Sequence, residues 1–194
     1  MEPIASVCVY CGARFGDDPA YKAAAETLGR ELAARGLELV FGGGNIGLMG
    51  AVSNAARTAG GKVTGIIPRD LERREIGGDS KNRLVIVDNM HERKMMMARL
   101  ADAFVVLPGG LGTLDETFEI VTWRQLGFHD KPIVIADIGG YWTLMRSTIE
   151  AIVTHGFADP VEGVLMEWVE DIPGVFAALE RADPPSTPLD TRPL

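Results

Sequence analysis

Short apolar segments alternate with longer segments of helical periodicity along almost the whole chain. The short segments are rich in β-branched residues and lie at residues 6–10, 38–41, 62–67, 83–87, 103–107, 132–136 and, more weakly, 164–167. The helical patterns occupy residues 19–35, 48–59, 92–101, 114–125, 141–154 and 173–181. Strands that alternate with helices are typical of βαβ units. We therefore expect an α/β fold, in which about seven parallel strands form a sheet with helices on both faces.

Length and composition predict one domain and exclude several classes of partner. The 194 residues are 46% apolar and 24% charged, which is ordinary for one globular domain. We expect this domain to span residues 1–182, followed by a flexible, proline-rich tail at 183–194. The net charge of −8 argues against binding to nucleic acids or to a membrane surface. Because no basic leader and no apolar run of about 18 residues is present, we expect a cytoplasmic protein.

The two cysteines have the Cys-x-x-Cys spacing of redox pairs and zinc sites. Cys8 lies in a strand-like segment, however, and Cys11 follows it directly. No second cysteine pair exists, and His91, His129 and His155 are far apart in the sequence. We therefore expect buried structural thiols and no metal site.

The most distinctive motif runs from Pro108 to Glu116, between an apolar strand and a helical pattern. Its glycines let backbone N–H groups approach an anion, and the start of a helix adds its unpaired N–H groups and positive dipole end. This predicts a phosphate cradle with Glu116 as a candidate catalytic carboxylate. A simpler explanation is that Thr113 and Glu116 form a capping box. The segment alone leaves both explanations open.

Glycines also follow other strands. Gly12 follows the first strand, and residues 42–44 follow the second. Ligands of open parallel sheets bind at the carboxyl ends of the strands, so we expect one crevice to collect these loops. The second loop also matches Gly-x-Gly-x-x-Gly, with Asp70 near the end of the next strand, which makes an NAD(P)-dependent oxidoreductase an alternative. Two glycine loops facing one crevice suit a mononucleotide better, and packing alone explains Gly47 and Gly50 equally well.

Two cations stand near the start of the helical pattern before residues 103–107. Positive charge at a helix N-terminus is unfavourable by roughly 0.3–1 kcal/mol per charge. Their position at a glycine-lined crevice therefore favours an anionic ligand, for which Arg93 supplies a planar, bidentate donor and Lys94 a second charge. The alternative is a solvated surface pair, partly offset by Glu92.

One face of the helix after the glycine motif carries both acids and large apolar side chains. Glu116, Glu119, Ile120 and Trp123 follow the spacing of a single helix face. Such a face suits a pocket wall that also meets a partner subunit, which predicts a homodimer. His129 follows in a loop, where we expect a solvated or loop-bracing residue without a catalytic role.

Taken together, four ordered motifs resemble the LONELY GUY family of cytokinin riboside 5′-monophosphate phosphoribohydrolases, often misnamed lysine decarboxylases. The motifs lie within residues 4–157 and read Gly42-Gly-Gly-x-x-Gly-Leu-Met-Gly50, Met90-His-x-Arg-Lys94, Pro108-Gly-Gly-x-Gly-Thr-x-x-Glu116 and Trp123-x-Gln-Leu-Gly-x-His129. The resemblance implies a single-domain, Rossmann-like, doubly wound fold and a homodimer or a higher assembly of dimers. It also implies hydrolysis of the N-glycosidic bond of adenosine-type 5′-monophosphates, either AMP or cytokinin riboside 5′-monophosphate.

The resemblance also assigns residues. Arg93 and Glu116 carry over as the catalytic pair. The substrate contacts that it implies are Glu75, Arg93, Lys94, Gly110, Leu111, Gly112, Thr113, Glu116 and Thr122, to which the glycine turns add Gly12, Gly43, Gly44 and Gly109. The chain departs from the family pattern at Ala13, Asp115 and Arg124, where a serine, a second glutamate and a smaller residue are common. These departures leave the reaction intact and bear on base preference and assembly.

The chemistry implied by the resemblance needs no metal, flavin, nicotinamide or pyridoxal group. Cleavage of the C1′–N9 bond develops positive charge on the ribose, which a carboxylate such as Glu116 stabilises. The main alternative is a non-catalytic carrier of a nucleotide or cofactor on the same fold. Such a carrier is expected to keep the glycine loops and to lose the pair of Arg93 and Glu116.

Overall fold

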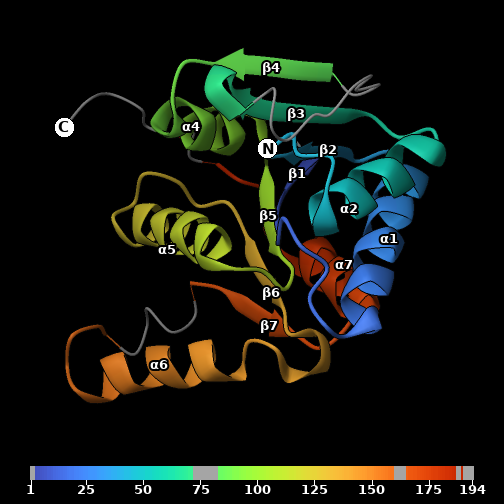
Figure 1. The fold of residues 1–194 in the computed structure, drawn as a ribbon. Helices are drawn as coiled ribbons and strands as arrows, with labels where there is room; N and C mark the ends of the chain where they lie inside the picture. The colour runs from blue at the N-terminus through green and yellow to red at the C-terminus, as the bar shows by residue number, and fades with distance from the viewer. Residues whose placement is uncertain (1–2, 72–82, 160–164, 187–188, 190–194) are drawn as a thin grey trace.

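The structure is a computed structural model that describes residues 3–71, 83–159, 165–186 and 189. One parallel sheet of seven strands runs through it in the order β4-β3-β2-β1-β5-β6-β7 (Figure 1). The strands are β1 (Ser6–Tyr10), β2 (Glu38–Phe41), β3 (Val63–Pro68), β4 (Arg83–Val87), β5 (Ala103–Val106), β6 (Ile133–Ala136) and β7 (Glu167–Val169). The predicted α/β class and parallel sheet are confirmed.

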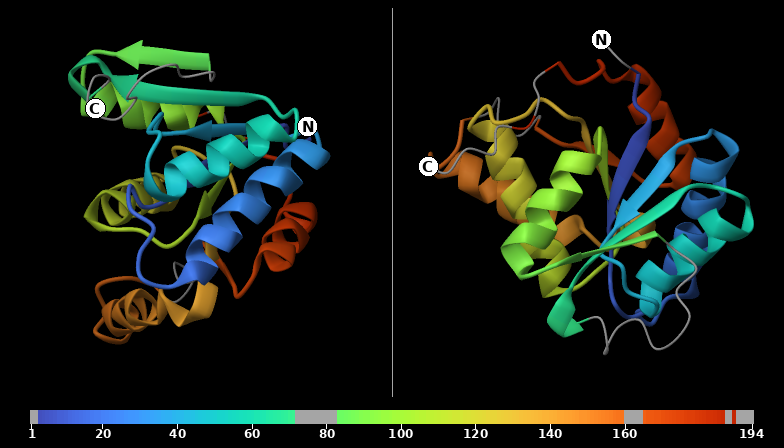
Figure 2. Two further views of the ribbon diagram at one scale, coloured as in Figure 1. Left: turned by 45° about the vertical axis from the view of Figure 1, so that its right-hand side comes forward. Right: turned by 90° about the horizontal axis from the view of Figure 1, so that it is seen from above.

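Helices cover both faces of the sheet (Figure 2). On one face lie α1 (Pro19–Ala34), α2 (Gly47–Thr58) and α7 (Ile172–Arg181). On the other lie α4 (Met90–Leu100), α5 (Leu111–Gln125) and α6 (Thr143–Thr154), with the short 3-10 helix η1 (Ile138–Gly140) between β6 and α6. The sheet is therefore doubly wound, as predicted.

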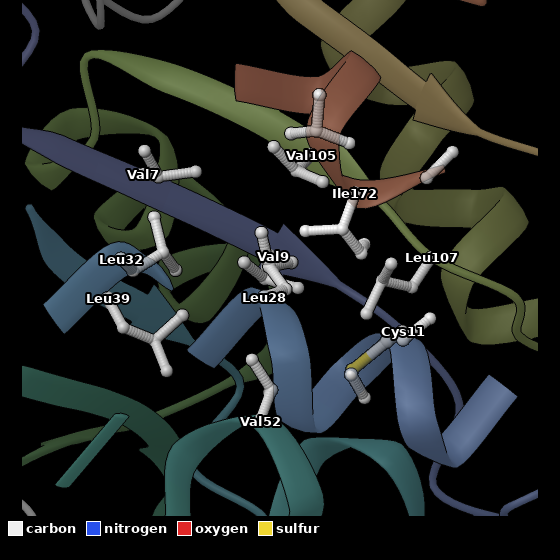
Figure 3. Packing of buried hydrophobic residues seen from close by; sticks show 14 of the residues in the cluster. Val7, Val9, Cys11, Leu28, Leu32, Leu39, Val52, Val105, Leu107 and Ile172 are labelled. Carbon is white, nitrogen blue, oxygen red and sulfur yellow. The ribbon is translucent and has the colours of Figure 1, made fainter. Parts of the chain in front are cut away.

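The sheet separates two hydrophobic cores. Along β1, Val7 and Val9 belong to the core under α1, α2 and α7, whereas Cys8 and Tyr10 belong to the core under α4, α5 and α6. This alternation follows from the two-residue period of a strand. Figure 3 shows the first core, in which Cys11 packs among aliphatic side chains. Both cysteines are buried free thiols, as expected.

Two helices begin two or three residues earlier than the sequence pattern indicated. α4 begins at Met90 because Asn89 caps it, and the Asn89 side chain accepts a hydrogen bond from the Glu92 amide at 2.9 Å. α5 begins at Leu111, behind an extended Gly110 that provides no side-chain cap. Thr113 therefore lies inside the first turn, and the predicted capping box of Thr113 and Glu116 is wrong.

The strand order reverses between β1 and β5. The chain moves outward from β1 through β2, β3 and β4, and then returns to place β5 on the other side of β1. The loops after β1 and β5 thus leave neighbouring strands in opposite directions, which opens a crevice between them. The loops touch where the Gly12 amide donates to the Pro108 carbonyl at 3.0 Å.

Two described residues of the predicted tail contact the domain. The Ser186 amide and hydroxyl donate to Asp130 Oδ2 at 2.9 and 2.6 Å. Leu189 packs against the core under α4, α5 and α6. In the described part of the chain, no helix is both long and apolar enough to cross a membrane.

Candidate active site

A cavity of about 650 Å³ lies in this crevice. Its wall combines the loop after β1, the start of α2, one turn of α4, the loop from β5 into α5, and two tyrosines. The volume is in the range of small-molecule sites. The cavity contains Arg93 and Glu116 together, from two different helices, and it contains Gly12 and the whole segment from Gly109 to Thr113.

The first turn of α5 has the features of an anion site. Its amides at the N-terminus have no intrahelical partners, and the N-cap residue is Gly110, which brings no side chain. A Cβ atom added to Gly110 or Gly112 would meet no atom of a more distant described residue within 4 Å, so packing against the described chain does not require glycine there. Open space at a glycine beside unpaired amides suits close approach of a phosphate group.

Gly109 has a different role in the same loop. A Cβ atom at this position would lie 2.1 Å from the Thr113 hydroxyl oxygen. Thr113 is 3% exposed and fills the space under the loop. Gly109 is thus needed for the loop to close onto α5, whereas Gly110 and Gly112 leave room for a ligand.

Tyr141 fixes this loop from outside. It follows η1, lines the cavity, and donates a hydrogen bond from its hydroxyl to the Gly109 carbonyl at 2.5 Å. Its ring makes edge contacts with Tyr21 and Trp142, at centroid distances of 5.4 and 4.7 Å. Nothing near Tyr141 in the sequence links it to the glycine motif, so sequence patterns alone do not indicate its role.

Glu116 lies one turn into α5 and faces the cavity. Burial raises the pKa of its carboxyl to about 7, although Arg93 and Lys94 act in the opposite direction. The nearby Asp115 and Glu119 raise the pKa further. A carboxyl that titrates near neutrality in a cavity is typical of active sites.

Arg93 is held beneath the cavity by backbone. Its side chain is 6% exposed, and Nη2 donates to the Gly42 carbonyl at 3.0 Å. Nη1 contacts the Met90 sulfur at 3.7 Å, whereas the buried Nε has no hydrogen-bond partner among the described residues. Because Arg93 is buried, the interpretation as a solvated surface residue is wrong. Because Arg93 also lines the cavity, its guanidinium can bind an anionic ligand there.

Lys94 is also buried, but it faces α5 and not the cavity. Its Nζ donates to Asp115 Oδ2 at 3.2 Å and lies 3.0 Å from Glu119 Oε1. Burial opposes its charge, yet the two carboxylates raise the pKa of Lys94 above its usual value. Arg93 and Lys94 are neighbours in the sequence, but Arg93 lines the cavity and Lys94 pairs with carboxylates of α5.

Several other predicted contact residues lie away from the cavity wall. Gly43 and Gly44 are buried behind it, and a Cβ atom at Gly43 would meet Ile67 Cβ at 3.1 Å. Thr122 is exposed on α5 and donates to the Phe118 carbonyl. Glu75 lies outside the described residues.

Packing accounts for the remaining glycines of the second loop. A Cβ atom at Gly47 would lie 2.2 Å from the Ala13 carbonyl carbon, and one at Gly50 would lie 2.1 Å from the Asn45 oxygen. The packing explanation for both positions is confirmed. The similarity of this loop to a dinucleotide fingerprint therefore needs no dinucleotide.

His129 is a bracing residue. It is 2% exposed, its Nε2 lies 3.0 Å from the Ile120 carbonyl, and its Nδ1 accepts a hydrogen bond from the Lys131 amide. Burial lowers the pKa of His129 to about 4, so the ring is neutral at pH 7. Lys131 in turn donates to the Ala98 and Ala101 carbonyls at the end of α4. Among the described residues, no group of histidine, cysteine and acidic side chains could hold a metal ion.

Solved structures share this fold. The molybdenum cofactor carrier protein from Chlamydomonas reinhardtii aligns with a TM-score of 0.67 and 20% identity, over 93% of this chain and 98% of that chain. The molybdenum cofactor binding protein from the phototrophic bacterium Rippkaea orientalis gives 0.66 and 19%, over 93% and 96%. At these identities the similarity concerns the fold alone.

Sequence comparison identifies the family. A family model described as "Possible lysine decarboxylase" matches residues 49–179. The probable cytokinin riboside 5′-monophosphate phosphoribohydrolase LOGL9 of Oryza sativa subsp. japonica is 43% identical over 178 residues, which cover 92% of this chain and 78% of the relative. The cytokinin riboside 5′-monophosphate phosphoribohydrolase LOG7 of Arabidopsis thaliana is 42% identical over 178 residues, which cover 92% and 82%. The chain therefore belongs to the LONELY GUY (LOG) family, whose family model carries the lysine decarboxylase description.

Proposed function

We propose that this protein hydrolyses the N-glycosidic bond of adenosine-type nucleoside 5′-monophosphates and releases the free base and ribose 5-phosphate. The observation that carries the proposal is one cavity that holds the buried Arg93, the desolvated Glu116 and the open glycine positions at the start of α5. The names of the relatives support the substrate class, which includes AMP and cytokinin riboside 5′-monophosphates.

Glu116 is the proposed catalytic carboxylate. When the C1′–N9 bond breaks, its electron pair leaves with the base and the ribose ring becomes positive. The carboxylate stabilises this charge and orients a water molecule whose oxygen bonds to C1′. One proton of the water passes to Glu116 and then to a ring nitrogen of the departing base. Because the pKa of Glu116 is about 7, the carboxyl can accept and release this proton at neutral pH.

Arg93 and the α5 start are proposed to hold the nucleotide. The 5′-phosphate is placed against the amides of the segment from Gly109 to Thr113, with Gly12 on the facing loop. The Arg93 guanidinium, which lines the cavity, donates to a ribose or phosphate oxygen. Contacts from Lys94, Gly43, Gly44, Thr122 and Glu75 stay predictions from the resemblance.

The alternatives receive less support from the site. A non-catalytic carrier is expected to lack the catalytic pair, yet Arg93 and Glu116 share the cavity. The alternative of an NAD(P)-dependent oxidoreductase was based on the second glycine loop, whose glycines packing explains.

The proposal also includes a homodimeric assembly and a cytoplasmic location. The homodimer has support from exposed apolar side chains on α5, at its C-cap and on α6, which are Phe118, Leu126 and Leu144.

The proposal is tested by supplying AMP, N6-isopentenyl-AMP and adenosine to the purified protein and measuring free base by chromatography. We expect release from at least one monophosphate and a kcat/KM for adenosine that is lower by roughly two orders of magnitude, because lost phosphate contacts are worth several kcal/mol. Equal kcat/KM values for AMP and adenosine would contradict the phosphate site. Release of no base from either monophosphate, together with tight nucleotide binding, would favour the carrier.

A further inference from the structure

Lys94 joins the two helices that carry the catalytic pair. It follows Arg93 on α4, and its two acidic partners, Asp115 and Glu119, lie one turn apart on α5. Glu116 is the sequence neighbour of the first of these acids and lies near the second. The Lys94 side chain is 11% exposed, and Lys94 is not among the residues that line the cavity.

We propose that Lys94 is a positioning residue for Glu116, which holds α5 against α4 and balances the two carboxylates on either side of the catalytic one. The inference rests on the catalytic role proposed for Glu116. It differs from the expectation that Lys94 binds the nucleotide, because two carboxylates at 3.2 and 3.0 Å already occupy its ammonium group.

The charges around Glu116 show what Lys94 contributes. From α4, Arg93 and Lys94 both lower the pKa of Glu116, and from α5, Asp115 and Glu119 raise it. The groups that face it from β1 and its following loop are Cys8, Tyr10 and Cys11, which are neutral because burial raises the pKa of each. Among the described residues, the charged groups around Glu116 are therefore two carboxylates, Asp115 and Glu119, and two cations, Arg93 and Lys94.

Removing Lys94 would leave two carboxylates unpaired beside Glu116. Their repulsion would then act fully, and the pKa of Glu116 would rise above its present value of about 7. A neutralised acid has the reverse effect: without Glu119, one source of repulsion disappears and the pKa of Glu116 falls. The two substitutions must therefore move the same titration in opposite directions.

The test is the pH dependence of kcat and KM for the monophosphate that the wild-type protein hydrolyses best. For Lys94→Met we expect the midpoint of the kcat profile to move up by about one pH unit, with KM within roughly threefold of the wild type. For Glu119→Gln we expect a shift to lower pH. Lys94→Arg keeps the positive charge and is expected to keep the wild-type midpoint. The control is Lys62→Met, which removes a positive charge from an exposed residue before β3, away from the site, and should also leave the midpoint unchanged.

The outcomes separate this inference from the proposed function. A Lys94→Met variant with an unmoved midpoint and a KM raised tenfold or more would overturn the inference and assign Lys94 to the nucleotide. If Lys94→Met does not fold, the direction of the Glu119→Gln shift still decides, and an unmoved or raised midpoint would overturn the inference. Full activity of Glu116→Gln would instead defeat the catalytic role of Glu116 itself.

Discussion

Arg93 lies directly over the α-carbon of Gly42. Nη2 donates to the Gly42 carbonyl at 3.0 Å, and a Cβ atom on Gly42 would lie only 2.0 Å from the same nitrogen. A side chain at position 42 and the present position of Arg93 exclude each other. The first glycine of the second loop thus makes room for Arg93 of the proposed catalytic pair, although Gly42 itself does not line the cavity.

Gly42→Ala is therefore expected to displace Arg93 while the charge of the protein stays the same. Position 42 does not have a positive φ, so alanine fits the backbone, and the atom that it meets is the end of a side chain. We expect a folded protein whose kcat/KM is lower by at least about tenfold, a loss of about 1.4 kcal/mol. Circular dichroism measures folding, and steady-state kinetics measure activity. Arg93→Lys is the comparison variant, because it keeps the positive charge and loses the planar guanidinium. Wild-type kinetics of Gly42→Ala would show that the position of Arg93 is unimportant.

Gly112→Ala separates stability from ligand binding. The added methyl group meets no other described part of the chain within 4 Å beyond its own helix, and alanine is more favourable than glycine in a helix by up to about 1 kcal/mol. We expect an unchanged or raised melting temperature. A phosphate placed against this turn would contact the methyl group, so KM for the monophosphate is expected to rise by roughly tenfold or more. Calorimetry and kinetics on the same sample measure both effects, and an unchanged KM would place the phosphate elsewhere.

Tyr141→Phe removes the hydroxyl that fixes the loop from β5 into α5, the proposed phosphate site, and keeps the ring contacts with Tyr21 and Trp142. One hydrogen bond contributes about 0.5–1.5 kcal/mol, so KM is expected to increase by about two- to tenfold while kcat stays near the wild-type value. The control is Tyr21→Phe, which makes the same chemical change in the neighbouring ring. Equal effects of the two variants would mean that the bond to Gly109 does not position the loop.

The sequence was sufficient to predict the sheet and the crevice in which the candidate site residues meet. Alternating strand and helix patterns, together with glycines after the strands, indicated a parallel sheet with a crevice at the carboxyl ends. Because Arg93 and Glu116 each belong to a local motif, both could be singled out before their helices were known to meet. The cavity then confirmed that they lie together.

The remainder depends on contacts between residues far apart in the chain. The pairing of Lys94 with Asp115 and Glu119 joins two helices, and no periodicity in the sequence indicates it. Thr113 and Glu116 have the spacing of a capping box, but the extended Gly110 starts the helix three residues earlier. Local spacing therefore suggested a role that the tertiary packing of Thr113 under Gly109 excludes.

Glu116→Gln is expected to lower kcat by about 10² to 10³ while nucleotide binding persists, because glutamine keeps the shape without the charge. Isothermal titration and single-turnover kinetics measure the two effects. The same variant should be more stable than the wild type at pH 8. The native pKa of Glu116, about 7, exceeds the unfolded value of 4.5, so the native state binds this proton more tightly and loses stability as pH rises between them.

This gain in stability is at most on the order of 3 kcal/mol and should disappear below about pH 4.5, where both states are protonated. Urea denaturation of both proteins at pH 4.5, 6 and 8 measures it. Equal stability of the two proteins at pH 8 would show that Glu116 is not desolvated, whatever its role in catalysis.

Trp123→Ala tests the proposed homodimer. Trp123 lies on the same face of α5 as Glu119 and Ile120, and this face is mixed: Ile120 is 1% exposed in the core, Glu119 pairs with Lys94, and Trp123 is half-buried at the edge of the core. A half-buried tryptophan on this mixed face offers an anchor for a partner subunit. Loss of such an anchor commonly costs 2 kcal/mol or more, roughly thirtyfold in affinity. We expect Trp123→Ala to weaken the dimer and to lower activity in parallel.

The matched aromatic control is Phe157→Ala, at an exposed position after α6. Sedimentation velocity and activity, measured over the same range of protein concentration, test the prediction. Sedimentation of the wild-type protein as an active monomer at micromolar concentration would refute the dimer and leave Trp123 as a packing residue of its own subunit.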